Sequence, residues 1–131
     1  MVLIDSSVWI PYFKGTKIPQ TLFLLENLHK NIFMMGDLIY MEVLQGFRSD
    51  NDYEIALNYF NLLPFECISS IDIALKSADN YRFLRKKGIT IRKSIDILIG
   101  TFCIENKIQL LHNDKDFLSM ESHLNLKTVP Q

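Results

Sequence analysis

Acidic residues in apolar surroundings are the part of this sequence that could do chemistry. Asp5 follows directly on the apolar run Val2–Ile4, and Asp114 comes soon after a later apolar run. Glu42 and Asp96 stand inside apolar stretches whose spacing predicts helices. Each acid has a structural explanation, as a turn residue, a helix cap, a first-turn acid or the polar edge of a helix. Only for Asp5 does the functional interpretation outweigh the structural one when the acids are considered singly.

Taken together, these acids predict a site for a divalent metal ion. A buried carboxylate loses hydration and neighbouring carboxylates repel one another, so a group of them needs a counter-charge. A hard cation with oxygen ligands supplies that charge. The histidines, His29, His112 and His123, are scattered and fit no zinc-binding spacing. Ligation by acids alone therefore predicts magnesium, with manganese as the alternative.

The elements that position these acids are predicted to alternate along the chain. Short apolar runs predict strands at 2–4, 32–35, 108–111 and 126–129, with a weaker candidate at 65–68. Helices are expected from Ser6 or Ser7 to about 13, then over 19–28, 37–47, 53–63, 70–84, 94–105 and 114–120. Ser6 or Ser7, Asp37 and Ser94 are the expected caps. Such alternation predicts an α/β fold with a mainly parallel sheet, which gathers ligands at the carboxyl ends of its strands.

The bulk properties limit the class of protein. A chain of 131 residues fits one domain, so residues 1–131 are expected to fold as a unit. Cys67 and Cys103 lie far apart among apolar neighbours, and are expected to be buried free thiols in a reducing compartment. No signal peptide or membrane span is predicted, so a cytoplasmic location is expected. The net charge of −1 means that any nucleic-acid role must rest on a local basic cluster.

A basic stretch leads directly into Asp96. Between positions 82 and 93 the chain has six basic residues and no acid: Arg82, Arg85, Lys86, Lys87, Arg92 and Lys93. A solvated helix end is the ordinary explanation of such a stretch. However, the stretch is long and leads into a suspected metal site. Contact with an RNA backbone is therefore as well supported as a solvated helix end.

The sequence resembles the PIN-domain ribonucleases, and more narrowly the VapC-type toxins of bacterial toxin–antitoxin pairs. The resemblance covers the whole chain and rests on VLIDSSVWI at 2–10, DLIYMEVLQG at 37–46, SIDILI at 94–99 and LLHNDKDF at 110–117. The last segment, an apolar strand running into Asp-x-Asp-Phe, is the most specific. This chain has Ser6-Ser7 where many relatives have Thr-Asn, Gly100-Thr101 where many have Ala-Ala, and His112 where threonine is common. No departure removes a carboxylate, so the differences bear only on substrate choice.

The resemblance implies a three-layer α/β/α fold with a metal pocket made of Asp5, Glu42, Asp96 and Asp114. Asp114 is expected to be the direct ligand because it leaves its strand first, and Asp116 to be a more distant metal ligand or a helix cap. Such a pocket suits metal-assisted hydrolysis of a phosphodiester, with Glu42 or Asp96 orienting or deprotonating the water. Ser6 is expected to contact the phosphate or a metal-bound water, as well as capping its helix.

The implied activity is that of a magnesium-dependent endoribonuclease toxin that inhibits translation. Transfer RNA is the favoured substrate, with messenger or ribosomal RNA as alternatives, and the implied partners are a cognate antitoxin and a second copy of the chain. A catalytically weak PIN-like module that binds RNA or protein would have the same fold, but no acid is missing. A phosphoryl-accepting signalling domain is disfavoured because no strand-end lysine stands out. A DNA nuclease of related fold is disfavoured because it needs additional segments.

Overall fold

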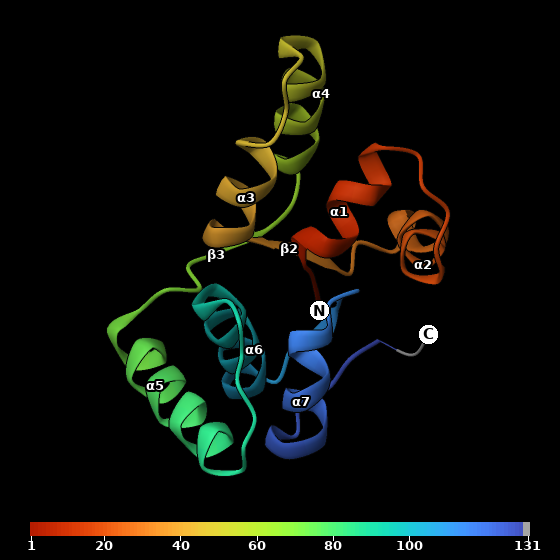
Figure 1. The fold of residues 1–131 in the computed structure, drawn as a ribbon. Helices are drawn as coiled ribbons and strands as arrows, with labels where there is room; N and C mark the ends of the chain where they lie inside the picture. The colour runs from red at the N-terminus through yellow and green to blue at the C-terminus, as the bar shows by residue number, and fades with distance from the viewer. Residues whose placement is uncertain (130–131) are drawn as a thin grey trace.

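The computed structural model describes residues 1–129, and it has a parallel sheet between two layers of helices (Figure 1). The four strands are β1 (Val2–Ile4), β2 (Phe33–Gly36), β3 (Phe65–Glu66) and β4 (Gln109–Leu111), in the order β3-β2-β1-β4. Every neighbouring pair is parallel. All of β1 and β2 is buried, as expected for central strands of a parallel sheet. The predicted α/β class and mainly parallel sheet are confirmed.

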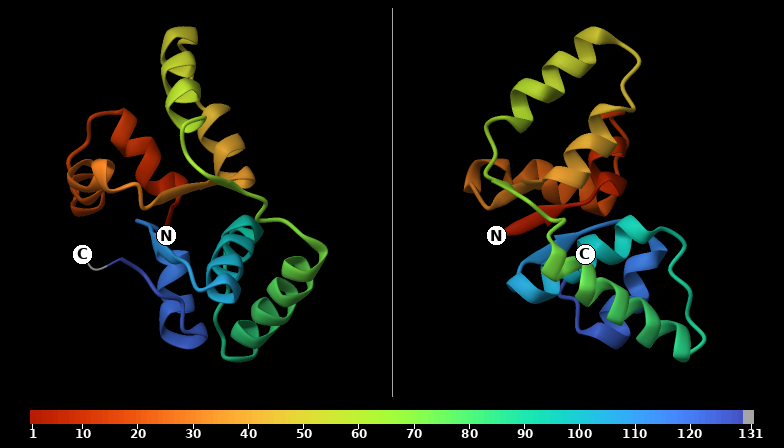
Figure 2. Two further views of the ribbon diagram at one scale, coloured as in Figure 1. Left: turned by 180° about the vertical axis from the view of Figure 1, so that it is seen from behind. Right: turned by 90° about the vertical axis from the view of Figure 1, so that its left-hand side faces the viewer.

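The helices divide between the two faces of the sheet. One layer contains the helices α1 to α4 and the other contains α5 to α7, and this division is visible from both directions in Figure 2. Their bounds are α1 Ser6–Phe13, α2 Pro19–Asn27, α3 Asp37–Leu44, α4 Asp50–Phe60, α5 Ile71–Lys86, α6 Ser94–Asn106 and α7 Lys115–Leu124, with a short 3₁₀ helix at Leu28–Lys30. Within the described residues, no helix is both long and apolar enough to cross a bilayer.

Several predicted helix starts are wrong in detail. Asp5, rather than a serine, caps α1, since its Oδ2 accepts the Ser7 N–H at 3.0 Å. Asp37 is the first residue of α3, and its Oδ1 accepts the backbone N–H of Ile68 at 2.8 Å. Ser94 is likewise the first residue of α6 and makes no capping bond. For Asp37, a tertiary contact that local propensity does not contain takes the side chain away from the expected capping position.

Other boundaries also differ from expectation. The helix expected at 53–63 begins earlier, because Ser49 caps α4 through the Asp52 N–H. The helix expected to reach position 47 ends at Leu44. The strand expected at 126–129 is reduced to one bridge, between Leu110 and Thr128. Cys67 is exposed, which corrects the expected burial, whereas Cys103 is buried as expected; both are free thiols.

Candidate active site

The carboxyl ends of β1 and β4 meet where the chain leaves the sheet. Asp5 donates its backbone N–H to the Leu111 carbonyl at 3.0 Å, which joins the end of β1 to the end of β4. The chain after β4 then turns through residues 112–114 into α7. Ser7 Oγ supports this turn by accepting the Asn113 N–H at 2.9 Å. The first turns of α6 and α7 approach the same place, and a helix N-terminus favours negative charge.

An acidic triplet lies at this place. One carboxylate oxygen from each of Asp96, Asp114 and Asp116 lies within 4.8 Å of the others, the one such group of metal-ligating side chains among residues 1–129. Asp96 is in the first turn of α6 and Asp116 in the first turn of α7, and both side chains are almost fully buried. Asp114 caps α7, with its Oδ1 accepting the Asp116 N–H at 3.0 Å. The tertiary fold thus brings acids from two helices together.

Asp5 and Glu42 lie beside this triplet rather than inside it. Asp5 is 1% exposed, and burial is the largest cause that raises its pKa; repulsion from Glu42 raises it further. The Asp5 charge in turn raises the pKa of Asp96. Asp5 thus lies within electrostatic range of both Glu42 and Asp96. Among residues 1–129, the acids whose oxygens lie within 4.8 Å of one another are Asp96, Asp114 and Asp116, so Asp116 is closer to the centre than expected, and the full set with Asp5 and Glu42 stays a prediction.

Several buried carboxylate oxygens of this group accept no hydrogen bond. In the described chain they are Asp5 Oδ1, Glu42 Oε1, Asp96 Oδ2 and Asp116 Oδ2, and Asp96 Oδ2 has only an ion pair with Lys93, at 3.4 Å. Buried polar atoms in native proteins are almost always paired. A divalent cation with oxygen ligands would satisfy such atoms and remove the repulsion among them. The residues present therefore fit a magnesium-type ion.

Asp114 and Asp116 differ in the number of partners they already have. Asp114 caps α7 and pairs with Lys93 and Arg92, and the Asp116 backbone N–H and Lys93 together hold its pKa below the usual range despite partial burial. Asp116 retains one buried oxygen with no partner. Both acids offer an oxygen to the triplet, so the expectation that Asp114 is the direct ligand stays a prediction. Asp114 also performs the capping role that was its structural alternative.

Two cations of the basic stretch point into the acids. Lys93 Nζ lies 2.9 Å from Asp114 Oδ2 and 3.4 Å from Asp96 Oδ2. Arg92 contacts the same group through Asp116 at 3.4 Å and Asp114 at 3.5 Å. The hydrogen bond to Asp114 is the largest cause that raises the pKa of Lys93. These two residues therefore neutralise the acids in this structure, which the sequence interpretation as RNA contacts did not anticipate.

The remaining predicted substrate contacts lie outside the acidic group. Arg82, Arg85, Lys86 and Lys87 are exposed around the C-terminal end of α5, with the Arg85 guanidinium 5.8 Å from the centre of the Tyr81 ring. They are available to solvent and to an anionic ligand. Ser6 is 8% exposed and follows Asp5 in the first turn of α1.

The raised pKa of Asp96 should make the free energy of unfolding depend on pH. Burial, the largest cause, and repulsion from Asp5 raise the pKa of Asp96 to about 7. A raised carboxyl pKa means that the folded protein holds a proton the unfolded chain has released, so its stabilising effect is lost as the pH rises toward 7. Urea denaturation in EDTA should give a free energy of unfolding that falls between pH 5 and pH 8. Asp96→Asn should flatten this fall, and an equal slope in both proteins would contradict the assignment.

The PIN domain family model matches residues 2–122. The chain belongs to the PIN-domain family. Its curated relatives include the VapC ribonuclease Mb1587 of Mycobacterium bovis and ribonuclease VapC11 of Mycobacterium tuberculosis, each 30% identical over 119 residues, or 89% of both chains. The resemblance to VapC-type PIN proteins seen in the sequence is therefore confirmed.

Solved structures agree with this PIN-domain assignment at the level of the fold. A VapBC2 structure of Rickettsia felis, bound to a promoter DNA fragment, matches with a TM-score of 0.75 and 18% identity over 98% of both chains. A DNA-bound VapBC structure of Salmonella typhimurium matches with a TM-score of 0.77 and 14% identity, over 98% of this chain and 96% of the other. The three-layer α/β/α architecture implied by the resemblance is thus shared with VapBC structures.

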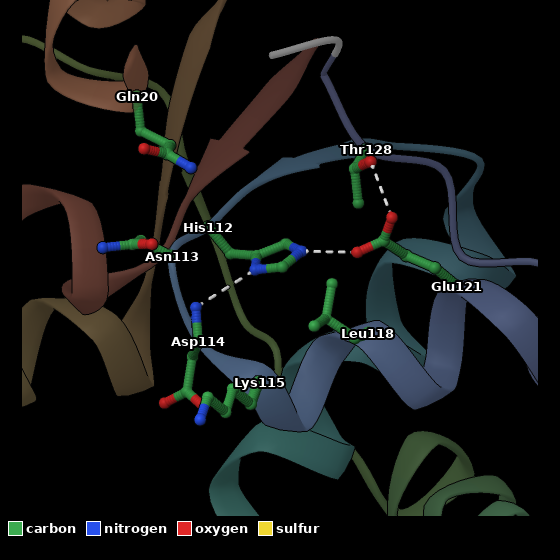
Figure 3. A pocket seen from close by; sticks show the side chains of 8 residues that line it. All are labelled: Gln20, His112, Asn113, Asp114, Lys115, Leu118, Glu121 and Thr128. Carbon is green, nitrogen blue, oxygen red and sulfur yellow. Dashed lines mark hydrogen bonds and ion pairs between the residues drawn. The ribbon is translucent and has the colours of Figure 1, made fainter. Parts of the chain in front are cut away.

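A second polar group, beside the acids of this PIN domain, was missed by sequence reasoning. His112 follows β4 and pairs with Glu121 of α7, with His112 Nε2 and Glu121 Oε2 2.8 Å apart (Figure 3). The sequence held one signal for it. Glu121 comes four residues after Phe117, so the two residues share a face of the predicted helix, and this face could have been expected to meet the end of the preceding strand. Sequence reasoning noted His112 only as one of three scattered histidines and as a departure from the family pattern.

Proposed function

We propose that this protein is a magnesium-dependent endoribonuclease, formed by residues 1–131 as a single nuclease domain, that acts as the toxin of a toxin–antitoxin pair. The observation that carries the proposal is the set of buried carboxylate oxygens without a hydrogen bond on Asp5, Glu42, Asp96 and Asp116, of which the Asp96 oxygen has only the Lys93 ammonium, 3.4 Å away. The names of the mycobacterial relatives, which describe them as VapC ribonucleases, support RNA as the substrate class. An RNA substrate, with transfer RNA favoured and translation inhibited as a result, would place the enzyme in the cytoplasm.

The roles follow from the position of each side chain. Asp5, Asp96, Asp114 and Asp116 would hold Mg²⁺, or Mn²⁺ as the alternative, and Asp114 also fixes the start of α7. When bound, such an ion would supply polarisation of a phosphoryl oxygen and a lowered pKa for a water. Glu42 is only partly buried and has one unpartnered oxygen, which suits it to orient or deprotonate the attacking water.

Basic residues would bring the anionic RNA to an acidic site. Arg82, Arg85, Lys86 and Lys87 form an exposed cationic surface on α5 and its end, close in sequence to the acids of α6. Cations that neutralise phosphates contribute affinity without sequence selectivity. Ser6, in the first turn of α1, is the proposed short-range contact to the phosphate or to a metal-bound water.

An antitoxin and a second copy of the chain are the proposed protein partners. The structural neighbours with shared fold are VapBC structures from Rickettsia felis and Salmonella typhimurium, and a toxin–antitoxin complex of Klebsiella pneumoniae matches with a TM-score of 0.66. A basic antitoxin side chain entering the acids would inhibit by charge pairing, as Lys93 pairs with Asp114 inside this chain.

The direct test is incubation of the purified protein with total cellular RNA, with Mg²⁺ or with EDTA, followed by mapping of the cut ends. We expect discrete cuts that require the metal and that disappear in Asp96→Asn. Binding of RNA without any cleavage would instead favour the catalytically weak binding module. Persistence of the cuts in EDTA would contradict the metal-dependent mechanism.

Lys93 should compete with the metal ion. Its ammonium group pairs with Asp96 and Asp114, so a bound ion has to displace or oppose it. We expect Lys93→Met to tighten Mn²⁺ or Mg²⁺ binding by about 2- to 30-fold, because each of its two ion pairs, at a partly exposed site, contributes roughly 0.2–1 kcal/mol. Calorimetric titration measures the affinity. Lys87→Met, an exposed lysine outside the acids, is the matched control, and weaker binding by Lys93→Met would contradict the competition.

A further inference from the structure

A cavity of about 310 Å³ opens beside the acids, on the far side of the turn that follows β4. Its walls come from α2, the turn at 112–114, α7 and the C-terminal segment, with Gln20, Leu118 and Thr128 on different sides (Figure 3). This volume lies at the lower end of the range of about 300–1,000 Å³ typical of small-ligand sites. The cavity therefore fits one nucleoside and excludes a duplex.

Hydrogen bonds fix the polar wall of this cavity. The Asp114 backbone N–H donates to His112 Nδ1 at 3.2 Å, so the neutral ring carries its proton on Nε2 and donates it to Glu121 Oε2 at 2.8 Å. Thr128 Oγ1 donates to Glu121 Oε1 at 3.2 Å. Since the His112 side chain is 7% exposed, the ring is held by the fold, and it orients the Glu121 carboxylate. Figure 3 shows the chain of bonds from Asp114 through His112 and Glu121 to Thr128.

The Glu121 carboxylate has acceptor capacity left for a ligand. Each oxygen uses one acceptor position within the protein, whereas a carboxylate offers about four. Its side chain is 30% exposed and lines the cavity. Leu118, on the adjacent turn of α7, is 53% exposed and provides an apolar surface at the same cavity. An acceptor pair beside an apolar surface suits a planar base whose edge carries hydrogen-bond donors.

The cavity shares Asp114 with the acidic triplet. A base bound in it would therefore belong to a nucleotide next to the phosphate held at the acids. Lys115, which also lines the cavity, is exposed in the first turn of α7 and could pair with a flanking phosphate.

We propose that this cavity is a nucleobase subsite in which Glu121 selects guanine beside the scissile phosphate, an inference that rests on the proposed RNA cleavage. Guanine presents an imino and an amino donor side by side, which match the two oxygens of one carboxylate. Cytosine and adenine offer one amino group at that edge, and uracil places carbonyl oxygens on both sides of its single donor. The expected order of preference is guanine first and uracil last.

The test compares cut sites in a randomised single-stranded RNA pool. The native protein should cut with guanine enriched at one position adjacent to the break. Glu121→Gln places an amide donor where guanine brings donors, and should lower that preference by about 5- to 100-fold. Leu118→Ser leaves the hydrogen bonds intact and should raise KM with little change in kcat. Ile55→Ala, an exposed apolar residue on the distant α4, is the control and should keep the native profile.

Each contrary outcome has a defined meaning. Unbiased cutting, or an unchanged profile in both Glu121→Gln and Leu118→Ser, would overturn the subsite. So would a loss of antitoxin binding in Leu118→Ser with base preference unchanged, since the cavity would then be a protein-docking site. If Glu121→Gln fails to fold, the KM of Leu118→Ser decides: a raised KM upholds the subsite, and an unchanged KM overturns it.

Binding of short oligonucleotides separates the subsite from the proposed activity. Native protein without added metal is titrated with two oligonucleotides that differ only in one guanine or uracil, and amide NMR shifts of Glu121 and Leu118 are followed. Guanine-selective shifts without any cleavage would uphold the subsite while the proposed nuclease fails. Cleavage of RNA without guanine-selective shifts would uphold the proposed nuclease and overturn the subsite.

Discussion

Asp5→Asn should strongly lower the rate of RNA cleavage while making the metal-free protein more resistant to heat. Asparagine retains the oxygen that caps α1 through the Ser7 N–H, so the helix start is preserved. It removes a charge that is buried and that repels Glu42. The activity should fall by about 100- to 1,000-fold, because an ion that stabilises charge in the transition state contributes several kcal/mol.

The two effects of Asp5→Asn are measured separately. Initial cleavage rates with saturating Mg²⁺ give the activity, and melting in EDTA at pH 7.5 gives the stability. Asp50→Asn is the control, since Asp50 is an exposed acid in the first turn of α4 and should change neither quantity strongly. A variant that loses activity and also melts at a lower temperature than the native protein would contradict this prediction. It would show that the contacts of the Asp5 carboxylate stabilise the fold more than its repulsion from other acids destabilises it.

Trp9→Ala should lower the free energy of unfolding by about 3–5 kcal/mol, as other large aromatic truncations in cores do. Trp9 is fully buried on α1, and its ring packs on Phe13 at 5.9 Å, Tyr59 at 5.8 Å and Phe60 at 4.9 Å between centroids. The residue thereby attaches α1, whose cap is Asp5, to α4. The melting temperature should fall by roughly 10–20 °C.

Trp9→Phe provides the matched control for this truncation. The indole Nε1 is buried without a hydrogen-bond partner, so phenylalanine loses no bond and removes an unsatisfied donor. Its destabilisation should be less than half that of Trp9→Ala by urea denaturation. Equal losses in the two variants would show that the nitrogen has a partner that matters, such as a bound water.

The local sequence determined the fold class and the position of most elements. Strands β1, β2 and β4 lie on the predicted apolar runs. Helix α1 ends at the expected position and α5 two residues later than expected, each just before a glycine with a positive φ angle, 74° at Gly15 and 80° at Gly88. These features depend on residues close together in the chain. The acids were also detectable locally, because a carboxylate in an apolar run is unfavourable unless the fold provides a partner.

Tertiary structure decided which partner each acid has. Sequence reasoning ranked Asp114 above Asp116 from its distance along the chain. The fold gives Asp114 a capping role and pairs it with Lys93, while one Asp116 oxygen stays unpartnered. Likewise, Lys93 belongs to a basic stretch in the sequence but lies among carboxylates in space.

The physical reason is the range of the forces involved. Helix and strand preferences depend on backbone and side-chain contacts within a few residues, so the sequence carries them directly. Burial and electrostatic pairing also act between separate elements of the chain, as when Lys93, just before α6, meets Asp114 at the start of α7. The sequence therefore determined which side chains were available for chemistry, and only the packing of β1, β4, α6 and α7 decided which of them meet.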